Sequence, residues 1–247
     1  MSKTNTGESF VCLKAKTKNN YSMQLLGHEI KLAILDLDGT LLASTSLWQD
    51  IDKEFFARRG MEVPPKYGEL IIPLGLAKGA IFTKEEYGLE DSVESILNEW
   101  HQMAVEAYRN DIQLKPHARE LLELLKANGL KLALATANSQ ELYEPCMKRL
   151  GILDFFDYIT DVHIVNEGKN SSRIYDIITE HFGLQKENVV VIEDALGAMT
   201  TVHDAGYLTI GVFDPNTTKN RAGCEQNCDL YLESFGPFLK QLKQESK

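Results

Sequence analysis

The sequence predicts an α/β protein, a three-layer doubly wound parallel sheet interrupted by one helical insertion. In the second half of the chain, short apolar runs alternate with amphipathic helical segments, a pattern typical of a parallel sheet with both faces covered. A further apolar run, Lys31–Leu37, lies far upstream and finds strand partners only in that second half. We therefore expect one core from residues 29–43 and 112–247, a helical insertion over 44–111 at the carboxyl edge of the sheet, and a flexible N-terminal extension over 1–28.

Each expected element has its own signal. Apolar runs mark the strands, and the helices begin near capping residues or Pro and end near Gly, as at Asn128-Gly129. In chain order we expect strands at 31–37, 130–135, 158–160, 189–192 and 208–212, helices at 116–126, 139–150, 170–182 and 195–205, and a last strand and helix around Leu230 and Phe238. The insertion carries aromatic residues at helical spacing, which we expect mostly to form its core (Trp48, Phe55, Phe56 and Trp100).

The composition limits the possible partners. A formal net charge of −10 over 247 residues predicts a surface that repels nucleic acid and anionic membranes. No segment approaches the roughly 20 apolar residues of a membrane span, and the N-terminus lacks a signal-peptide core, so we expect a soluble, cytoplasmic protein. The pair Cys224 and Cys228 has no second Cys or His pair nearby, which disfavours a zinc site. Nothing in the sequence indicates an oligomeric state.

Two carboxylates follow the first strand. Asp36 and Asp38 are two positions apart, so on an extended chain both side chains point to the same side. Adjacent anions repel unless a cation or a shared proton relieves them, and Mg²⁺ typically binds one or two carboxylates together with substrate phosphate oxygens. The alternative is an ordinary turn, because Asp-Gly is common there. Taken alone, the two interpretations are about equally favoured.

Thr136 and Asn138 follow the strand at 130–135. A hydroxyl and an amide next to the free N–H groups of a helix start suit phosphate oxygens. The alternative is a simple capping box, with Asn138 as N-cap and Glu141 three residues later, which in isolation is favoured about two to one. Asn138 can serve both purposes.

Glu193 and Asp194 end the very apolar strand at 189–192. Acidic groups there are costly unless they are paired or bind a metal. Asp194 as N-cap of the next helix is the alternative. A second acidic pair at a second strand end is what a metal shared with Asp36 and Asp38 requires, and we favour the metal site.

Lys169 precedes the helix at 170–182. A lone Lys is usually a solvated surface charge, and in isolation that interpretation is the better one. A site with several carboxylates and a phosphate nevertheless needs a fixed cation, and few other basic residues lie near strand ends. Together these groups indicate phosphoryl transfer, in which an Asp attacks phosphorus and the resulting aspartyl-phosphate is hydrolysed.

The motifs resemble those of the haloacid dehalogenase (HAD) superfamily, in the branch with a helical cap that includes β-phosphoglucomutase and sugar-phosphate phosphatases. The similarity covers about residues 30–240. It rests on Asp36-Leu-Asp38-Gly39-Thr40, on Thr136 in Ala135-Thr-Ala-Asn138, on Lys169, and on Glu193-Asp194-Ala-Leu-Gly197. The resemblance implies a Rossmann-like core, a cap over 44–111 and Mg²⁺ as cofactor.

The resemblance also implies a role for each site residue. Asp36 would be the nucleophile, and Asp38 would be the general acid/base that also binds metal through its backbone carbonyl. The implied catalytic set is Asp36, Asp38, Thr136 and Lys169; the phosphate-binding set is Thr136, Asn138 and Lys169; the metal-binding set is Asp36, Asp38, Glu193 and Asp194.

The expected function is Mg²⁺-dependent hydrolysis of a small phosphorylated metabolite, most readily a sugar or polyol phosphate. A phosphosugar mutase of the β-phosphoglucomutase type is the first alternative. It is less favoured because Trp48 lies near the position of the mutase His, and the cap offers Lys78 but no evident equivalent of the mutase Arg. A non-catalytic, receiver-like phosphoacceptor domain is the second alternative, which the large helical insertion disfavours. One departure from the family is Asn170-Ser-Ser-Arg173, where Pro-x-Pro-Asp is usual.

Overall fold

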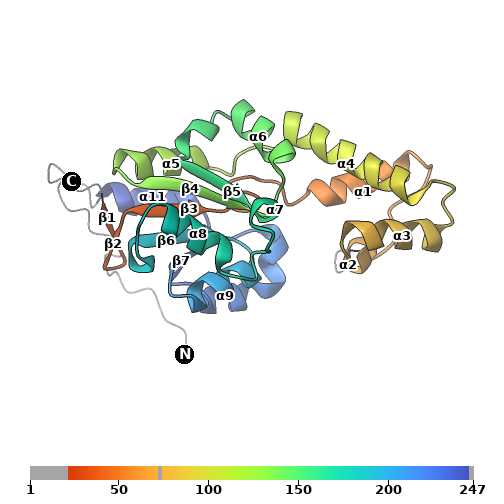
Figure 1. The fold of residues 1–247 in the computed structure, drawn as a ribbon. Helices are drawn as coiled ribbons and strands as arrows, with labels where there is room; N and C mark the ends of the chain where they lie inside the picture. Colours follow the sequence, from red (N-terminus) through yellow and green to blue (C-terminus); the bar gives the residue numbers. More distant parts are fainter. Residues whose placement is uncertain (1–21, 72–73, 245–247) are drawn as a thin grey trace.

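A parallel six-stranded sheet forms the centre of the computed structural model, which describes residues 22–71 and 74–244 (Figure 1). The strand order is β5-β4-β3-β6-β7-β8. The strands are β3 (Leu32–Leu35), β4 (Lys131–Thr136), β5 (Tyr158–Asp161), β6 (Val189–Glu193), β7 (Leu208–Val212) and β8 (Leu230–Leu232). When the six strands of this sheet are numbered 1 to 6 along the chain, their order is 3-2-1-4-5-6, which is that of doubly wound folds. The predicted fold class is confirmed.

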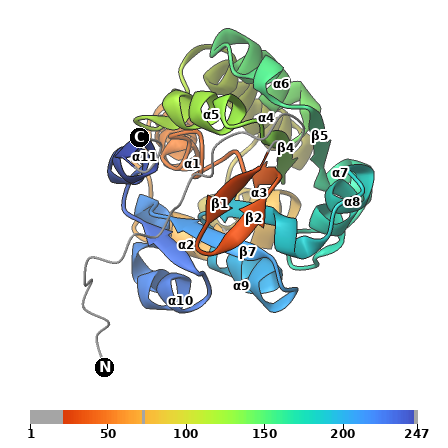
Figure 2. The same ribbon diagram turned by 90° about the vertical axis from the view of Figure 1, so that its left-hand side faces the viewer.

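Helices cover both faces of the sheet and make it a three-layer structure (Figure 2). Along β3, Ala33 and Leu35 pack in one hydrophobic cluster, and Leu32 and Ile34 pack in the other, because successive side chains of a strand point to opposite faces. The first face carries α5 (Ala118–Ala127), α6 (Gln140–Arg149) and α11 (Phe235–Gln244); the second carries α8 (Arg173–His181) and α9 (Leu196–Asp204). Shorter elements are α7 (Val162–Val165), α10 (Arg221–Gln226) and 3₁₀ turns at Leu153–Phe155, Lys186–Asn188 and Pro215–Asn220.

The strand order reverses between β3 and β6, which makes their carboxyl ends a topological switch point. From β3 the chain proceeds to β4 and β5 on one side, and later to β6, β7 and β8 on the other. The pairing of β3 with β6 continues past the strand, where the N–H of Asp36 donates to the carbonyl oxygen of Ile192 at 3.0 Å. Ligands of doubly wound sheets bind at such a switch point.

Four helices between β3 and β4 extend away from this edge of the sheet (Figure 1). They are α1 (Leu47–Ala57), α2 (Tyr67–Ile71), α3 (Gly75–Tyr87) and α4 (Val93–Asn110). Phe55, Phe56 and Trp100 are buried in their core as expected, whereas Trp48 is 42% exposed, so the expectation is wrong for that residue. We call these helices the cap, and the division of the chain into core and cap remains a proposal.

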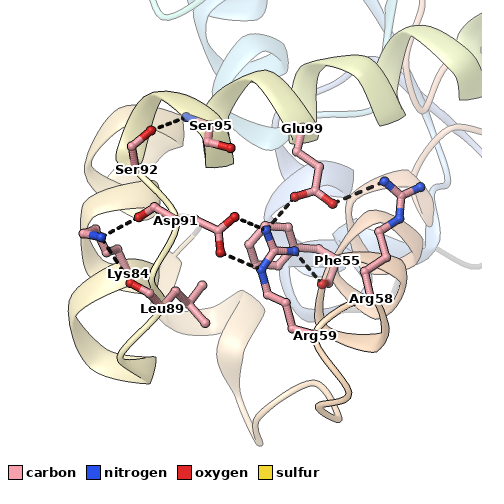
Figure 3. A network of polar contacts seen from close by, with 9 residues as sticks. All are labelled: Phe55, Arg58, Arg59, Lys84, Leu89, Asp91, Ser92, Ser95 and Glu99. Carbon is pink, nitrogen blue, oxygen red and sulfur yellow. Dashed lines mark hydrogen bonds and ion pairs between the residues drawn. The ribbon is translucent and has the colours of Figure 1, made fainter.

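Arg59 links three segments of the cap (Figure 3). Its guanidinium lies 3.7 Å from the centre of the Phe55 ring, and Nη2 donates to Asp91 at 2.9 Å and to Glu99 at 2.6 Å. A planar guanidinium presents five N–H donors in a fixed fork, so it can bond two carboxylates and stack on an aromatic ring at the same time. The end of α1, the α3–α4 loop and the first half of α4 are thereby joined.

A short hairpin corrects one sequence expectation. Residues 1–21 lie outside the described residues, but β1 (Met23–Leu25) and β2 (His28–Ile30) form an antiparallel pair at the end of the sheet opposite the cap (Figure 2). The prediction of a flexible extension is therefore wrong for residues 22–28. The hairpin is held because Met23, Leu25 and Ile30 are almost completely buried.

Within residues 22–71 and 74–244, no helix combines the length and apolarity that crossing a bilayer would require.

Candidate active site

Three carboxylates from separate parts of the sequence converge at this switch point. Asp36 follows β3, Glu193 ends β6 and Asp194 comes next. One oxygen from each lies within 4.8 Å of the others, and all three side chains are buried. The sheet order explains this meeting, because β3 and β6 are neighbours whose carboxyl ends share one edge.

Lys169 supplies the positive charge beside them. Its Nζ contacts Asp36 Oδ1 and lies 2.6 Å from Glu193 Oε1, and only 11% of its side chain is exposed. Burial opposes its charge, but the carboxylates of Asp36 and Glu193 outweigh burial and raise the pKa of Lys169 well above its ordinary value. The surface alternative for Lys169 is therefore wrong.

The carboxylate cluster still lacks positive charge. Burial, and then the neighbouring Asp36, raise the pKa of Glu193; burial and both neighbours raise the pKa of Asp194 well above its ordinary range. Asp36 Oδ2 is buried and has no hydrogen-bond partner among the described residues. Unpaired buried carboxylate oxygens are costly and are the ligands that hard divalent cations prefer. Asp36, Glu193 and Asp194 thus fit a Mg²⁺ ion.

Gly39 allows the two acidic motifs to approach each other. Its φ is +86°, and a Cβ atom at this position would stand 2.4 Å from Asp194 Oδ2. A side chain is therefore excluded both by the left-handed backbone and by the nearby carboxylate. Asp38 and Gly39 form a turn, as one of the two sequence interpretations predicted. The same turn brings the first acidic motif next to Asp194.

Asp38 points toward the end of α4 and the start of α6. Its Oδ1 accepts a hydrogen bond from the hydroxyl of Tyr108 at 2.5 Å, and its Oδ2 accepts one from Asn138 Nδ2 at 3.1 Å. Burial is the main reason that the pKa of Tyr108 is raised, followed by the charge of Asp38. The phenol therefore remains a hydrogen-bond donor at neutral pH.

Thr136 and Asn138 lie at the end of β4, but the capping alternative for Asn138 is wrong. The N-cap of α6 is Ser139, and the Asn138 side chain turns to Asp38 instead. The buried Thr136 hydroxyl oxygen accepts a hydrogen bond from the Asn138 N–H at 3.0 Å. The hydroxyl proton of Thr136 is left to donate elsewhere.

Asp194 is likewise not an N-cap. Ala195 occupies that position of α9, and the backbone N–H groups of Asp194 and Ala195 both donate to Glu193 Oε2, at 2.9 Å and 3.3 Å. Glu193 thus accepts the N–H groups of the two residues that precede α9, and the Asp194 carboxylate lies beside those of Asp36 and Glu193.

Three residues of the site had no role assigned from the sequence. The Thr40 hydroxyl donates to Asp194, Tyr108 to Asp38, and Tyr175 to Glu193 Oε1 at 3.3 Å. Tyr108 carried one signal, since it continues the i, i+4 series of Trp100 and Ala104 at the end of α4.

Other groups singled out in the sequence lie outside this cluster. Arg173 is exposed at the first position of α8, and Lys78 is exposed on α3.

Comparison with known proteins agrees with this geometry. A family model for haloacid dehalogenase-like hydrolases matches residues 30–206. A phosphorylated carbohydrates phosphatase from Thermotoga maritima is 25% identical over 177 residues, 72% of this chain and 82% of that protein. Hexitol phosphatase B from Escherichia coli (strain K12) is 24% identical over 191 residues, 76% and 85% of the two chains. A crystal structure from Thermotoga maritima, provisionally named a β-phosphoglucomutase, has a TM-score of 0.77 at 24% identity and covers 87% of this chain and 99% of its own; this likeness concerns the fold.

Proposed function

Because the chain belongs to the haloacid dehalogenase-like hydrolase family, we propose that it is a Mg²⁺-dependent phosphatase of a small phosphorylated carbohydrate or polyol. The observation that carries this proposal is the meeting of Asp36, Glu193 and Asp194 beside Lys169 at the switch point of the sheet. Charge neutralisation of this kind is the main requirement of phosphoryl transfer.

Asp36 is the nucleophile. One of its carboxylate oxygens attacks phosphorus, and the bond from phosphorus to the leaving oxygen breaks as the aspartyl-phosphate forms. Water then attacks the same phosphorus, releases inorganic phosphate and regenerates the carboxylate. The burial of Asp36 limits competing water, and the contact with Lys169 offsets charge on the transferring group.

Asp38 carries the protons. It donates one to the leaving oxygen in the first step and takes one from the attacking water in the second. Its place two residues after Asp36 puts both carboxylates at the same strand end, one for covalent chemistry and one for proton transfer.

Thr136, Asn138 and Lys169 hold the phosphoryl group. The hydroxyl of Thr136 accepts a bond from the Asn138 N–H, which leaves its own proton available to donate to a phosphoryl oxygen. Lys169 contributes a charge-assisted donor from the segment that precedes α8.

The proposed metal ligands are Asp36, Glu193 and Asp194, together with the backbone carbonyl of Asp38. Their fit rests on the unpartnered Asp36 oxygen and on the raised pKa values of Glu193 and Asp194. When bound, Mg²⁺ neutralises this cluster and the phosphoryl oxygens.

Carbohydrate and polyol phosphates are proposed because of the names of the relatives, a phosphorylated carbohydrates phosphatase and a hexitol phosphatase. A mutase is not favoured, since it must hold a second phosphate, Trp48 lies near the position of the mutase His, and the cap offers Lys78 but no evident equivalent of the mutase Arg. The family assignment also removes the receiver alternative.

The test is a panel of sugar, polyol and nucleotide phosphates with Mg²⁺, in which released inorganic phosphate and any isomerised sugar phosphate are measured. We expect free phosphate from at least one carbohydrate or polyol phosphate, and loss of turnover by about 10⁴-fold or more in Asp36→Asn. An isomerised product without free phosphate would favour the mutase. Undiminished phosphate release by Asp36→Asn would remove the aspartyl-phosphate mechanism.

A further inference from the structure

Both oxygens of the Asp38 carboxylate accept hydrogen bonds from donors that lie far apart in the sequence. The hydroxyl of Tyr108 donates to Oδ1 at 2.5 Å from α4, and Asn138 Nδ2 donates to Oδ2 at 3.1 Å from the start of α6. Two donors at two oxygens fix the plane of a carboxylate, which a single donor does not. Asp38 is therefore oriented by one residue of the cap and one of the core.

Tyr108 is held against the core although it belongs to the cap. Arg149, the last residue of α6, donates through Nη2 to the carbonyl oxygens of Tyr108 and Ile112, at 3.2 Å and 2.5 Å. The Tyr108 side chain is itself buried, with 5% exposed. These contacts hold the end of α4 against α6 and place the Tyr108 hydroxyl beside Asp38.

Asn138 is fixed in the same manner. Its Oδ1 accepts a hydrogen bond from the N–H of Ser139 at 3.0 Å, so the amide is oriented and Nδ2 must point to Asp38. Each donor to Asp38 is supported by a further bond behind it, which is how an acid/base group is kept in a productive orientation.

We propose that Tyr108 is a positioning residue which, together with Asn138, holds the Asp38 carboxylate in the orientation from which it protonates the leaving oxygen. This inference rests on the proposed phosphatase function. Tyr108 does not touch phosphorus or the leaving group; it acts through Asp38. In the first step, its loss slows only those substrates whose leaving oxygen needs a proton.

Two substrates of similar size separate this role from a structural one. p-Nitrophenyl phosphate releases a stable phenolate that leaves without a proton, whereas benzyl phosphate releases an alkoxide that must be protonated. The quantity compared is kcat/KM, measured with Mg²⁺, which reports the steps through phosphoryl transfer to Asp36.

For Tyr108→Phe we expect kcat/KM for benzyl phosphate to fall by about 10- to 100-fold, and that for p-nitrophenyl phosphate by less than about 3-fold. Asn138→Ala removes the second donor to Asp38 and also a proposed phosphate contact, so it should lower both values, and that for benzyl phosphate more. Tyr67→Phe is the matched control, because it removes a buried cap hydroxyl that pairs with Thr83 at 2.7 Å, and it should change neither value by more than about 2-fold.

Circular dichroism verifies that each variant folds. If the wild type hydrolyses both compounds and Tyr108→Phe changes both equally or not at all, the positioning role is overturned and the phosphatase proposal stands. A wild type that hydrolyses neither compound, nor any member of the phosphate panel, overturns the proposed function and this role with it.

Discussion

The hydroxyl of Thr40 donates a hydrogen bond of 2.9 Å to Asp194 Oδ1, although 154 positions separate the two residues. This bond joins the loop after β3 to the loop after β6 and orients one of the proposed metal ligands. Burial and two neighbouring carboxylates raise the pKa of Asp194, and the bond from Thr40 opposes them. Groups that orient a metal ligand in this way commonly account for 10- to 100-fold in metal affinity.

Thr40→Val should therefore weaken Mg²⁺ binding by about 10-fold or more, with the fold retained. Isothermal titration calorimetry measures the affinity without reference to activity. Thr201→Val is the control, since the Thr201 hydroxyl bonds only to the Gly197 carbonyl on the exposed side of α9. A Mg²⁺ dissociation constant within about twofold of the wild type would show that Thr40 does not support the ligand.

Lys169 gives a second prediction, because it is the charge partner of two buried carboxylates. Lys169→Met leaves the carboxylates of Asp36 and Glu193 without a charge partner, which should lower the free energy of unfolding by about 3–5 kcal/mol in the absence of Mg²⁺. The same substitution should reduce turnover by about 100-fold or more. Added Mg²⁺ should recover part of the stability, because it binds only the folded cluster.

Urea unfolding in the presence of a chelator and then of Mg²⁺ measures both effects. Lys186→Met is the control: Lys186 pairs with Asp176 at 2.8 Å with 37% of its side chain exposed, so its loss should cost about 0–1 kcal/mol. Equal stability losses for the two variants would return Lys169 to the status of an ordinary surface charge.

The strands and the carboxylates at their ends were predictable because their signals are local. The buried runs of β3 and β6 are apolar throughout, and each ends in an acidic pair, so the sequence order of strand and carboxylate already implied one shared edge. The hydrogen bonds of Thr40 and Tyr108 were not predictable, because their partners lie 154 and 70 positions away in the sequence and meet them only in the folded chain.

Local rules also gave wrong predictions where a tertiary contact competed with them. Asn138 is a good N-cap by propensity, but its amide gains a bond to the Asp38 carboxylate and Ser139 takes the cap position. The hairpin of β1 and β2 was missed because its turn is Leu26-Gly27, with φ of 50° and 84°, rather than the usual Asn-Gly.

Arg59 gives a third prediction, about the cap alone. Arg59→Ala removes the bonds to Asp91 and Glu99 and the stacking on Phe55, so it should destabilise the protein by about 1–3 kcal/mol and increase hydrogen exchange in α1 and α4 (Figure 3). Arg58→Ala is the neighbouring control, with about half of its side chain exposed, and should cost about 0.5 kcal/mol or less. Unchanged exchange in α1 and α4 of Arg59→Ala would show that the network does not hold the cap.

Asp52 gives a pH-dependent prediction. It is 7% exposed on α1, and burial raises the pKa of its carboxyl from 3.8 to about 6. Between these values the folded protein keeps a proton that the unfolded chain has released, so stability falls as the pH rises from about 4 to about 6, and the full penalty persists above pH 6. Asp52→Asn cannot ionise and should be more stable than the wild type by about 1–3 kcal/mol at pH 7.5, with the difference disappearing near pH 4.

Asp50→Asn on the same helix is the control of opposite sign. The bond from Lys53 lowers the pKa of Asp50, so losing that bond should slightly destabilise the protein at pH 7.5. Thermal unfolding of the three proteins from pH 4 to 8 measures these differences, and parallel curves for Asp52→Asn and the wild type would mean that Asp52 is not held in an apolar setting.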